Sequence, residues 1–155
     1  MHVLFDSVDL DQIPASATAV AGYVGGAWPT FQALQARFPN ARHVSIAVNA
    51  GEDAEVLDIE TGDANPSEAP AWARRQLGRG ATRPCLYASL SVMPSVVAAM
   101  AGAGIHRTVY RLWVAHFTDE PHIPVGFGAC QWTCNSMGRN LDESLTLPGF
   151  FNAKP

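Results

Sequence analysis

Charged side chains are scarce in this sequence: Lys, Arg, Asp and Glu make up only 15% of its 155 residues, and the formal net charge is −4. No basic cluster is larger than Arg74-Arg75. A chain with 48% hydrophobic residues and so little charge is not a disordered segment, and it lacks the basic surface that nucleic acid or an acidic membrane requires. Its length suits one domain, so we expect residues 1–155 to share a single core.

Cysteine is sparse as well. Three cysteines are too few for a disulfide framework, and their odd number without a secretion signal predicts no intrachain disulfide. Cys130 and Cys134 lie four residues apart with no set of histidines nearby, which is a poor metal motif. We therefore expect free, buried thiols and neither a metal nor another cofactor.

Long hydrophobic runs are missing too. No stretch approaches the roughly 18 apolar residues of a membrane span, and Met1–Asp6 lacks the basic region of a secretory signal peptide. We expect no membrane span, and any work outside a cell would need another delivery route. The sequence also lacks a Gly-x-Ser-x-Gly elbow, and the glycine-rich Ala21–Gly26 fits neither the dinucleotide nor the Walker pattern.

Short strand-like runs are the main feature that is present. They are Val3–Asp6, Ala19–Val24, His43–Val48, Val56–Glu60, Cys85–Ser89, Val109–Phe117 and Phe127–Thr133, with a weaker run at Leu141–Leu145. Periodicity and capping residues predict helices over Pro29–Phe38, Ser67–Leu77 and Ser91–Ala103, the second with Ser67 as N-cap.

Strands that alternate with helices indicate parallel α/β units, and about eight strands indicate a barrel. A regular barrel of that type needs at least about 200 residues. We therefore expect an α/β fold, a reduced TIM-like β/α barrel with about eight strands and few helices. The link from Val48 to Val56 is shorter than a parallel crossover, which predicts an antiparallel or irregular pair there.

Carboxylates stand at the ends of several of these runs. Asp58 and Glu60 are spaced i, i+2 and face the same way in a strand. Asp6 ends another apolar run, and Asp142 lies in the last candidate strand. Acidic residues there are costly unless a site uses them, and several at one mouth are typical of acid/base chemistry, above all of glycoside cleavage. The alternative explanation is that these carboxylates cap turns, as Asp6, which directly precedes Ser7, would do.

Aromatic residues accompany the same strand ends. Tyr23, Tyr87, Trp113 and Trp132 lie in expected strands, and aromatic faces stack on sugar rings. For each of them, core packing is the alternative explanation. Trp72, on an expected helix, is assigned to the core.

The order of these pieces resembles a known family. Phe5-Asp6-Ser7, Gly22-Tyr23, Leu57-Asp58-Ile59-Glu60, Leu86-Tyr87-Ala88-Ser89, Leu112-Trp113-Val114-Ala115, Cys130-Gln131-Trp132 and Leu141-Asp142 follow one another as in the glycoside hydrolase family 25 lysozymes (muramidases). They are more similar still to the related glycoside-hydrolase-like domain of unknown function of actinobacteria and their phages. The resemblance spans nearly the whole chain.

The resemblance implies a β/α barrel that cleaves the glycan of peptidoglycan. Glu60 would be the general acid, Asp58 would stabilise or position, and Asp6 and Asp142 would complete an acidic floor. Tyr23, Tyr87, Trp113, Gln131 and Trp132 would bind substrate. Because the chain is short, a second hypothesis stays open: a non-catalytic module that binds peptidoglycan or another polysaccharide, or a structural part of a phage particle. Either would act at the bacterial cell wall.

Overall fold

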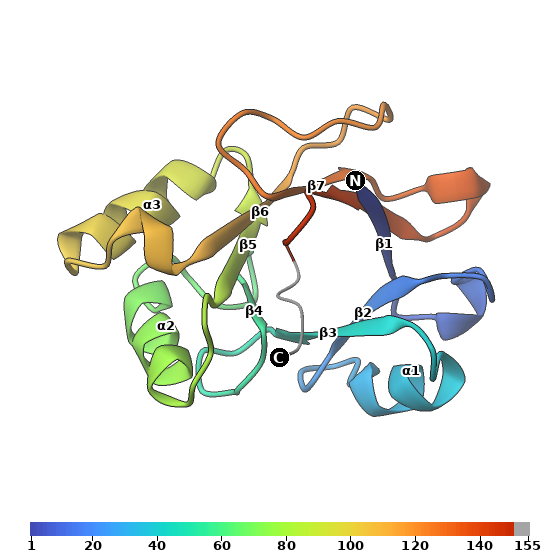
Figure 1. The fold of residues 1–155 in the computed structure, drawn as a ribbon, viewed down its shortest axis with the longest axis horizontal. Helices are drawn as coiled ribbons and strands as arrows, with labels where there is room; N and C mark the ends of the chain where they lie inside the picture. Colours follow the sequence, from blue (N-terminus) through green and yellow to red (C-terminus); the bar gives the residue numbers. More distant parts are fainter. Residues whose placement is uncertain (151–155) are drawn as a thin grey trace.

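The computed structural model describes residues 1–150, which form a closed eight-stranded barrel with three α-helices (Figure 1). The strands are β1 (His2–Asp6), β2 (Ala19–Tyr23), β3 (Arg42–Ala47), β4 (Val56–Asp58), β5 (Cys85–Ser89), β6 (Arg111–Ala115), β7 (Ala129–Thr133) and β8 (Asp142–Thr146). The helices are α1 (Phe31–Arg37), α2 (Ala69–Gly78) and α3 (Met93–Gly102). The predicted reduced barrel with few helices is confirmed.

Strands β1 to β7 pair in parallel in chain order, and β8 closes the ring antiparallel to both β7 and β1. The prediction of an antiparallel or irregular pair after Val48 is wrong, since β3 and β4 are parallel. Val56, the first residue of β4, pairs with Ile46, next to the end of β3. The short link therefore has to return only a small distance along the barrel, and it needs no helix to do so.

Two helix starts differ from prediction. Helix α2 begins at Ala69 after Glu68, and the Ser67 hydroxyl donates to Asn65 Oδ1 instead of capping the helix. Helix α3 begins at Met93, while the Ser91 and Ser89 hydroxyl groups bond to each other at 3.0 Å. The predicted N-cap Ser67 therefore bonds within a local turn instead, and the predicted start of α3 at Ser91 is two residues too early.

Side chains alternate between the inside of the barrel and its outer face, as strand geometry requires. The inner core includes Leu4, Val44, Ile46, Val56, Cys85, Tyr87 and Trp113. Outside β4 to β6, a second core forms under α2 and α3 and contains the fully buried Trp72, as predicted. A third group, with Val20 and Leu34, packs around α1. Figure 1 shows α2 and α3 side by side on one flank of the ring.

Within residues 1–150, no helix is both long and apolar enough to cross a membrane. All three cysteines of the chain lie in this part; Cys85 and Cys130 are buried, Cys134 is exposed, and none of them forms a disulfide.

Candidate active site

The carboxyl ends of the parallel strands carry an acidic mouth. Asp6 is the last residue of β1 and pairs in register with Asp142, the first residue of the antiparallel β8. Asp58 ends β4, and Glu60 follows two residues later on the same side. All four carboxyl groups line one cavity of about 220 Å³, together with Tyr23, Ile46, Tyr87, Trp113, Phe117, Gln131 and Cys134. The register of β1 with β8 thus joins the two ends of the chain at one site.

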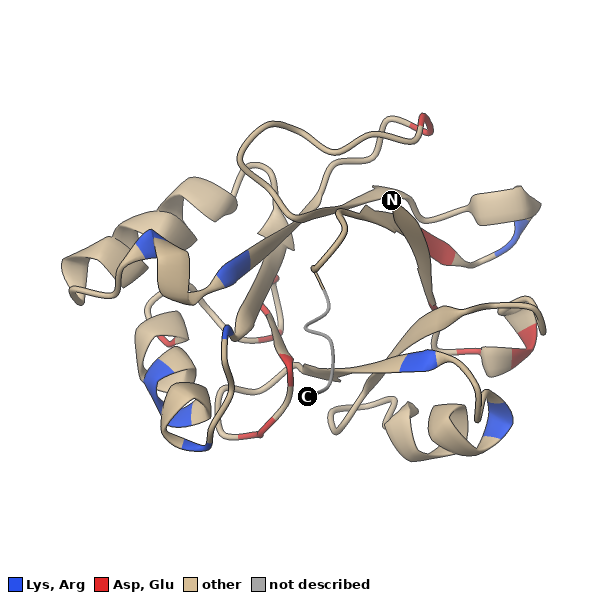
Figure 2. Ribbon diagram, viewed as in Figure 1, with Lys and Arg blue, Asp and Glu red and all other residues tan. Residues whose placement is uncertain are grey.

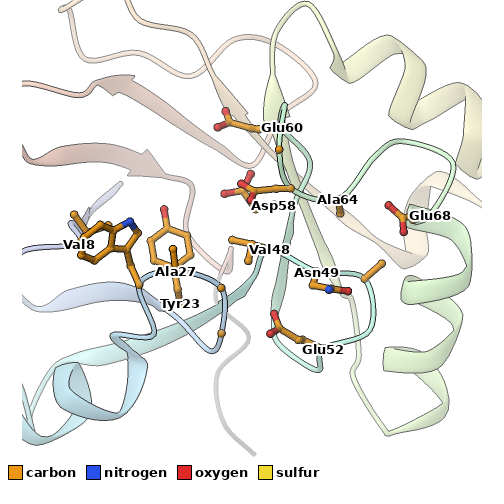
Figure 3. A pocket seen from close by; sticks show the side chains of 16 residues that line it. Val8, Tyr23, Ala27, Val48, Asn49, Glu52, Asp58, Glu60, Ala64 and Glu68 are labelled. Atoms are coloured by element: carbon orange, nitrogen blue, oxygen red, sulfur yellow. The ribbon is translucent and has the colours of Figure 1, made fainter.

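A larger cavity of about 680 Å³ adjoins this mouth and shares Tyr23, Asp58 and Glu60 with it (Figure 3). The loops after β2, β3 and β4 supply its other walls, among them Trp28, Val48, Asn49, Glu52, Asp63 and Glu68. None of the described residues that line either cavity is a lysine or an arginine. We call the two adjoining cavities together the acidic cleft; Asp58 and Glu60 line both of them.

Gly25 and Gly26 allow two loops to meet at the wall of this cleft. A Cβ on Gly25 would lie 1.8 Å from Glu52 Oε1, and one on Gly26 would lie 2.6 Å from Val48 Cγ2. Gly26 also has a φ of 75°, in the left-handed region that favours glycine. The glycine-rich stretch that fits no phosphate-binding pattern therefore has a structural role here.

Burial dominates the electrostatics of the mouth. Asp58 is only 5% exposed, and burial, followed by the nearby charge of Glu60, raises its pKa to about 8. Burial also raises the pKa of Glu60, with Asp63 adding to the effect and the Tyr87 hydroxyl opposing it. Burial and the charge of Asp63, and not crowding by Asp58, therefore raise the pKa of Glu60. A carboxyl group with a pKa of about 8 is mainly protonated at pH 7.

Asp6 and Asp142 form a second carboxyl pair. Burial raises the pKa of Asp6 well above its usual value, and the Asp142 charge and hydrogen bond raise it further. Burial raises the pKa of Asp142 as well, but hydrogen bonds from Asp6 and from Gln131 lower it. Within this pair Asp6 keeps a proton more readily than Asp142, because the hydrogen bond between them raises the pKa of Asp6 and lowers that of Asp142.

A chain of side chains orients the charged member of the pair. The Tyr87 hydroxyl donates to Gln131 Oε1 at 2.5 Å, and Gln131 in turn bonds to Asp142. Trp113 is held by its indole N–H, which donates to Ser144 Oγ at 3.0 Å. Tyr87 has one hydroxyl proton, so it can donate to Gln131 or to Glu60 at any one time.

The alternative that these acids cap turns is not what the structure shows for Asp6 and Asp58. Among the described residues, Asp6 Oδ1 and Asp58 Oδ1 are buried side-chain atoms with no hydrogen-bond partner. Ser7, which Asp6 would have capped, instead donates to the Asn140 carbonyl oxygen and accepts from the Asp9 N–H. Buried acceptors without partners cost free energy, which is typical of a site built for a ligand.

Eight of the nine predicted site residues lie at the cleft, and Trp132 does not. Its neighbour Gln131 points into the barrel, so alternation turns Trp132 outward against the core under α2 and α3. Prediction missed Phe117, Cys134, Glu52, Asp63 and Glu68. Phe117 lies four residues after Trp113, and this even spacing puts both side chains on the same face of an extended chain. The other four residues come from loops, which have no periodic pattern from which their position could be predicted.

The fold has a counterpart among solved structures. The crystal structure of an uncharacterized protein from B. stearothermophilus superimposes with a TM-score of 0.73 over 97% of this chain and 98% of that chain. The two sequences are 14% identical, so the likeness concerns the fold alone. No family model matches this sequence, and no curated protein does.

Proposed function

We propose that this protein is a glycosidase of the muramidase type that hydrolyses the glycan strands of peptidoglycan. One observation supports this above all: four carboxyl groups from β1, β8 and the end of β4 meet in one cavity, and their pKa values are raised. Glycoside hydrolysis needs both a protonated acid and an ionised carboxylate. The choice of peptidoglycan rests on the order of motifs in the sequence.

In this proposal Glu60 is the general acid. It lies at the exposed rim where the two cavities meet, and burial raises its pKa, which favours the protonated form that a general acid needs. Glu60 gives its proton to the glycosidic oxygen, and that oxygen takes the electron pair of the bond to the sugar C1 as the bond breaks. Water then adds to C1 and returns a proton to Glu60, so the enzyme ends unchanged.

The other carboxyl groups support the same step. Asp142, oriented by Gln131, holds the negative charge that stabilises the positive charge on the sugar ring. Asp58, protonated near neutral pH, offers a hydrogen-bond donor to a substrate oxygen from the floor of the cleft. Tyr23 and the exposed Trp28 form apolar surface for sugar rings along the larger cavity.

The test is the release of reducing ends from purified cell walls by the wild-type protein and by Glu60→Gln. General acid catalysis contributes roughly 10²–10⁴-fold, so the variant should lose at least that much activity with little change in Tm. Glu120→Gln, at an exposed position that lines neither cavity, is the matched control and should keep full activity. Equal release by wild type and Glu60→Gln would remove Glu60 as the acid. No release from walls of several chemotypes would favour the non-catalytic glycan-binding or structural module.

A further inference from the structure

A separate cavity of about 240 Å³ lies at the opposite end of the barrel, where the parallel strands begin. Arg83 lies just before β5, Arg111 is the first residue of β6, and Gly128 immediately precedes β7. Arg107, in the turn before β6, completes the basic side. The rest of the wall is apolar and consists of Leu112, Phe127, Leu147, Pro148 and Phe150 with neighbouring glycines.

Three guanidinium groups meet here, and no described residue that lines the cavity is a carboxylate. The four ion pairs formed within residues 1–150 use Arg37, Arg42, Arg75 and Arg79 instead. Arg111 is only 8% exposed. A buried cation without a negative partner is costly, and three cations side by side repel one another. Arg111 is the only charged residue of β6, and Figure 2 shows few basic positions on the strands of the barrel.

Backbone carbonyl oxygens hold the three side chains in place. Arg107 donates to the carbonyl oxygens of Tyr110 and Gly126 at 2.9 and 3.0 Å. Arg111 donates to those of Arg83, at 2.7 Å, and of Phe150. The guanidinium groups also lie over aromatic rings, Arg107 over Tyr110 and Arg111 over Phe150. Carbonyl oxygens fix the orientation of these groups, but they do not neutralise their charge, and each guanidinium has five N–H donors to offer.

We propose that this cavity binds a phosphate-type oxyanion, either free phosphate or a small phosphate monoester. A phosphate group near neutral pH carries between one and two negative charges and presents three oxygens. As a ligand for three fixed guanidinium groups it therefore fits better than a carboxylate, which has one charge and two oxygens. The apolar wall gives an ester's organic part a surface to contact. The site lies at the other end of the barrel from the carboxyl cleft, and it is independent of the proposed glycosidase activity.

Isothermal titration calorimetry on the full chain tests this, with inorganic phosphate, glycerol 3-phosphate and acetate at one constant ionic strength. Arg107→Gln is the main variant, because Arg107 is half-buried and makes no ion pair within residues 1–150. Arg83→Gln, at an exposed position, is the second. Arg79→Gln is the matched control: it removes the same charge from an exposed side chain that pairs with Asp53 on α2's side of the molecule.

We expect saturable phosphate binding that weakens at least about tenfold in Arg107→Gln and Arg83→Gln and is unchanged in Arg79→Gln, since a charge-assisted hydrogen bond is lost only in the first two. Tighter binding of glycerol 3-phosphate would identify an ester as the ligand, and equal binding would identify free phosphate. Acetate bound as tightly as phosphate, no binding of either phosphate compound, or equal weakening in Arg79→Gln would overturn the proposal. A protein inactive on cell walls that still binds phosphate would refute only the proposed function.

Discussion

At the scale of single residues, burial more than charge crowding tunes the carboxyl groups of the cleft. Asp6 and Asp58 are 3% and 5% exposed, and for both of them burial is the largest cause of the raised pKa. Such groups weaken the fold when they ionise. The cleft therefore retains buried carboxyl groups that lower the free energy of unfolding, which is common at functional sites.

Asp58→Asn should stabilise the protein above neutral pH. The folded-state pKa of Asp58, about 8, lies above the unfolded value of about 4. The folded state thus binds more protons between these values, and the stability contributed by the group falls as pH rises from about 4 to 8. At pH 8 the gain in unfolding free energy should be roughly 2–5 kcal/mol, on a scale of about 1.4 kcal/mol per pKa unit. Urea denaturation at pH 4 and pH 8 measures it; an equal effect at both pH values would contradict it.

Substitutions of Trp28 and of Trp132 should have opposite effects. Trp28 is 62% exposed and lines the larger cavity, while Trp132 packs against the outer core. Trp28→Ala should weaken retention on cell-wall glycan and leave Tm nearly unchanged. Trp132→Ala should lower the unfolding free energy by up to about 3 kcal/mol, because it removes packed apolar surface. Pull-down on insoluble peptidoglycan beside a thermal melt separates the two; a Trp28→Ala variant that unfolds early would refute the assignment.

At the scale of elements, helix α2 anchors the loop that joins β3 to β4. The Trp72 indole N–H donates to the Glu52 carbonyl oxygen at 2.9 Å. Arg75 donates to the carbonyl oxygens of Ala50 and Glu52, both at 2.7 Å, and pairs with Asp53 at 3.0 Å. This loop carries Glu52 and Asn49 to the cleft, so the helix holds one wall of the cleft in place through the loop.

Trp72→Phe should loosen that loop while leaving the barrel folded. The change keeps most of the apolar contact and removes the N–H donor, so the unfolding free energy should fall by about 1–2 kcal/mol. Amide hydrogen exchange over residues 48–55 should speed up, and exchange in β5 and β6 should not. Trp28→Phe, at an exposed position, is the control. Uniform acceleration across the barrel would show that Trp72 acts through the core alone.

At the scale of the whole molecule, the inner and outer cores of the barrel shield two of the three thiols. Cys85 lies inside the barrel, and burial raises its pKa to about 12; burial likewise raises that of Cys130 to about 11. Only Cys134 is exposed. A thiol reagent at pH 8 should therefore modify one cysteine in the native protein and three in denaturant without reductant. Fewer than three in denaturant would reveal a disulfide.

Strand periodicity in the sequence determined much of this arrangement. Alternation places Asp58 and Glu60 on one face, helical periodicity places Trp72 in the core, and the number of runs indicates a barrel with few helices. The same rule, applied to Gln131 and Trp132 together, would have separated them, since neighbours in a strand cannot face one cavity. These are local properties, which a few consecutive residues decide.

Register and closure were decided only by the tertiary structure. The sequence does not record that Asp6 pairs with Asp142 across β1 and β8, or that β4 starts beside the end of β3, because pairing depends on residues far apart in the chain. The same holds for Arg83, Arg107 and Arg111, which look isolated in a chain of net charge −4 until closure gathers them at one end of the barrel. Burial, and with it the pKa of each carboxyl group in the cleft, follows from that closure.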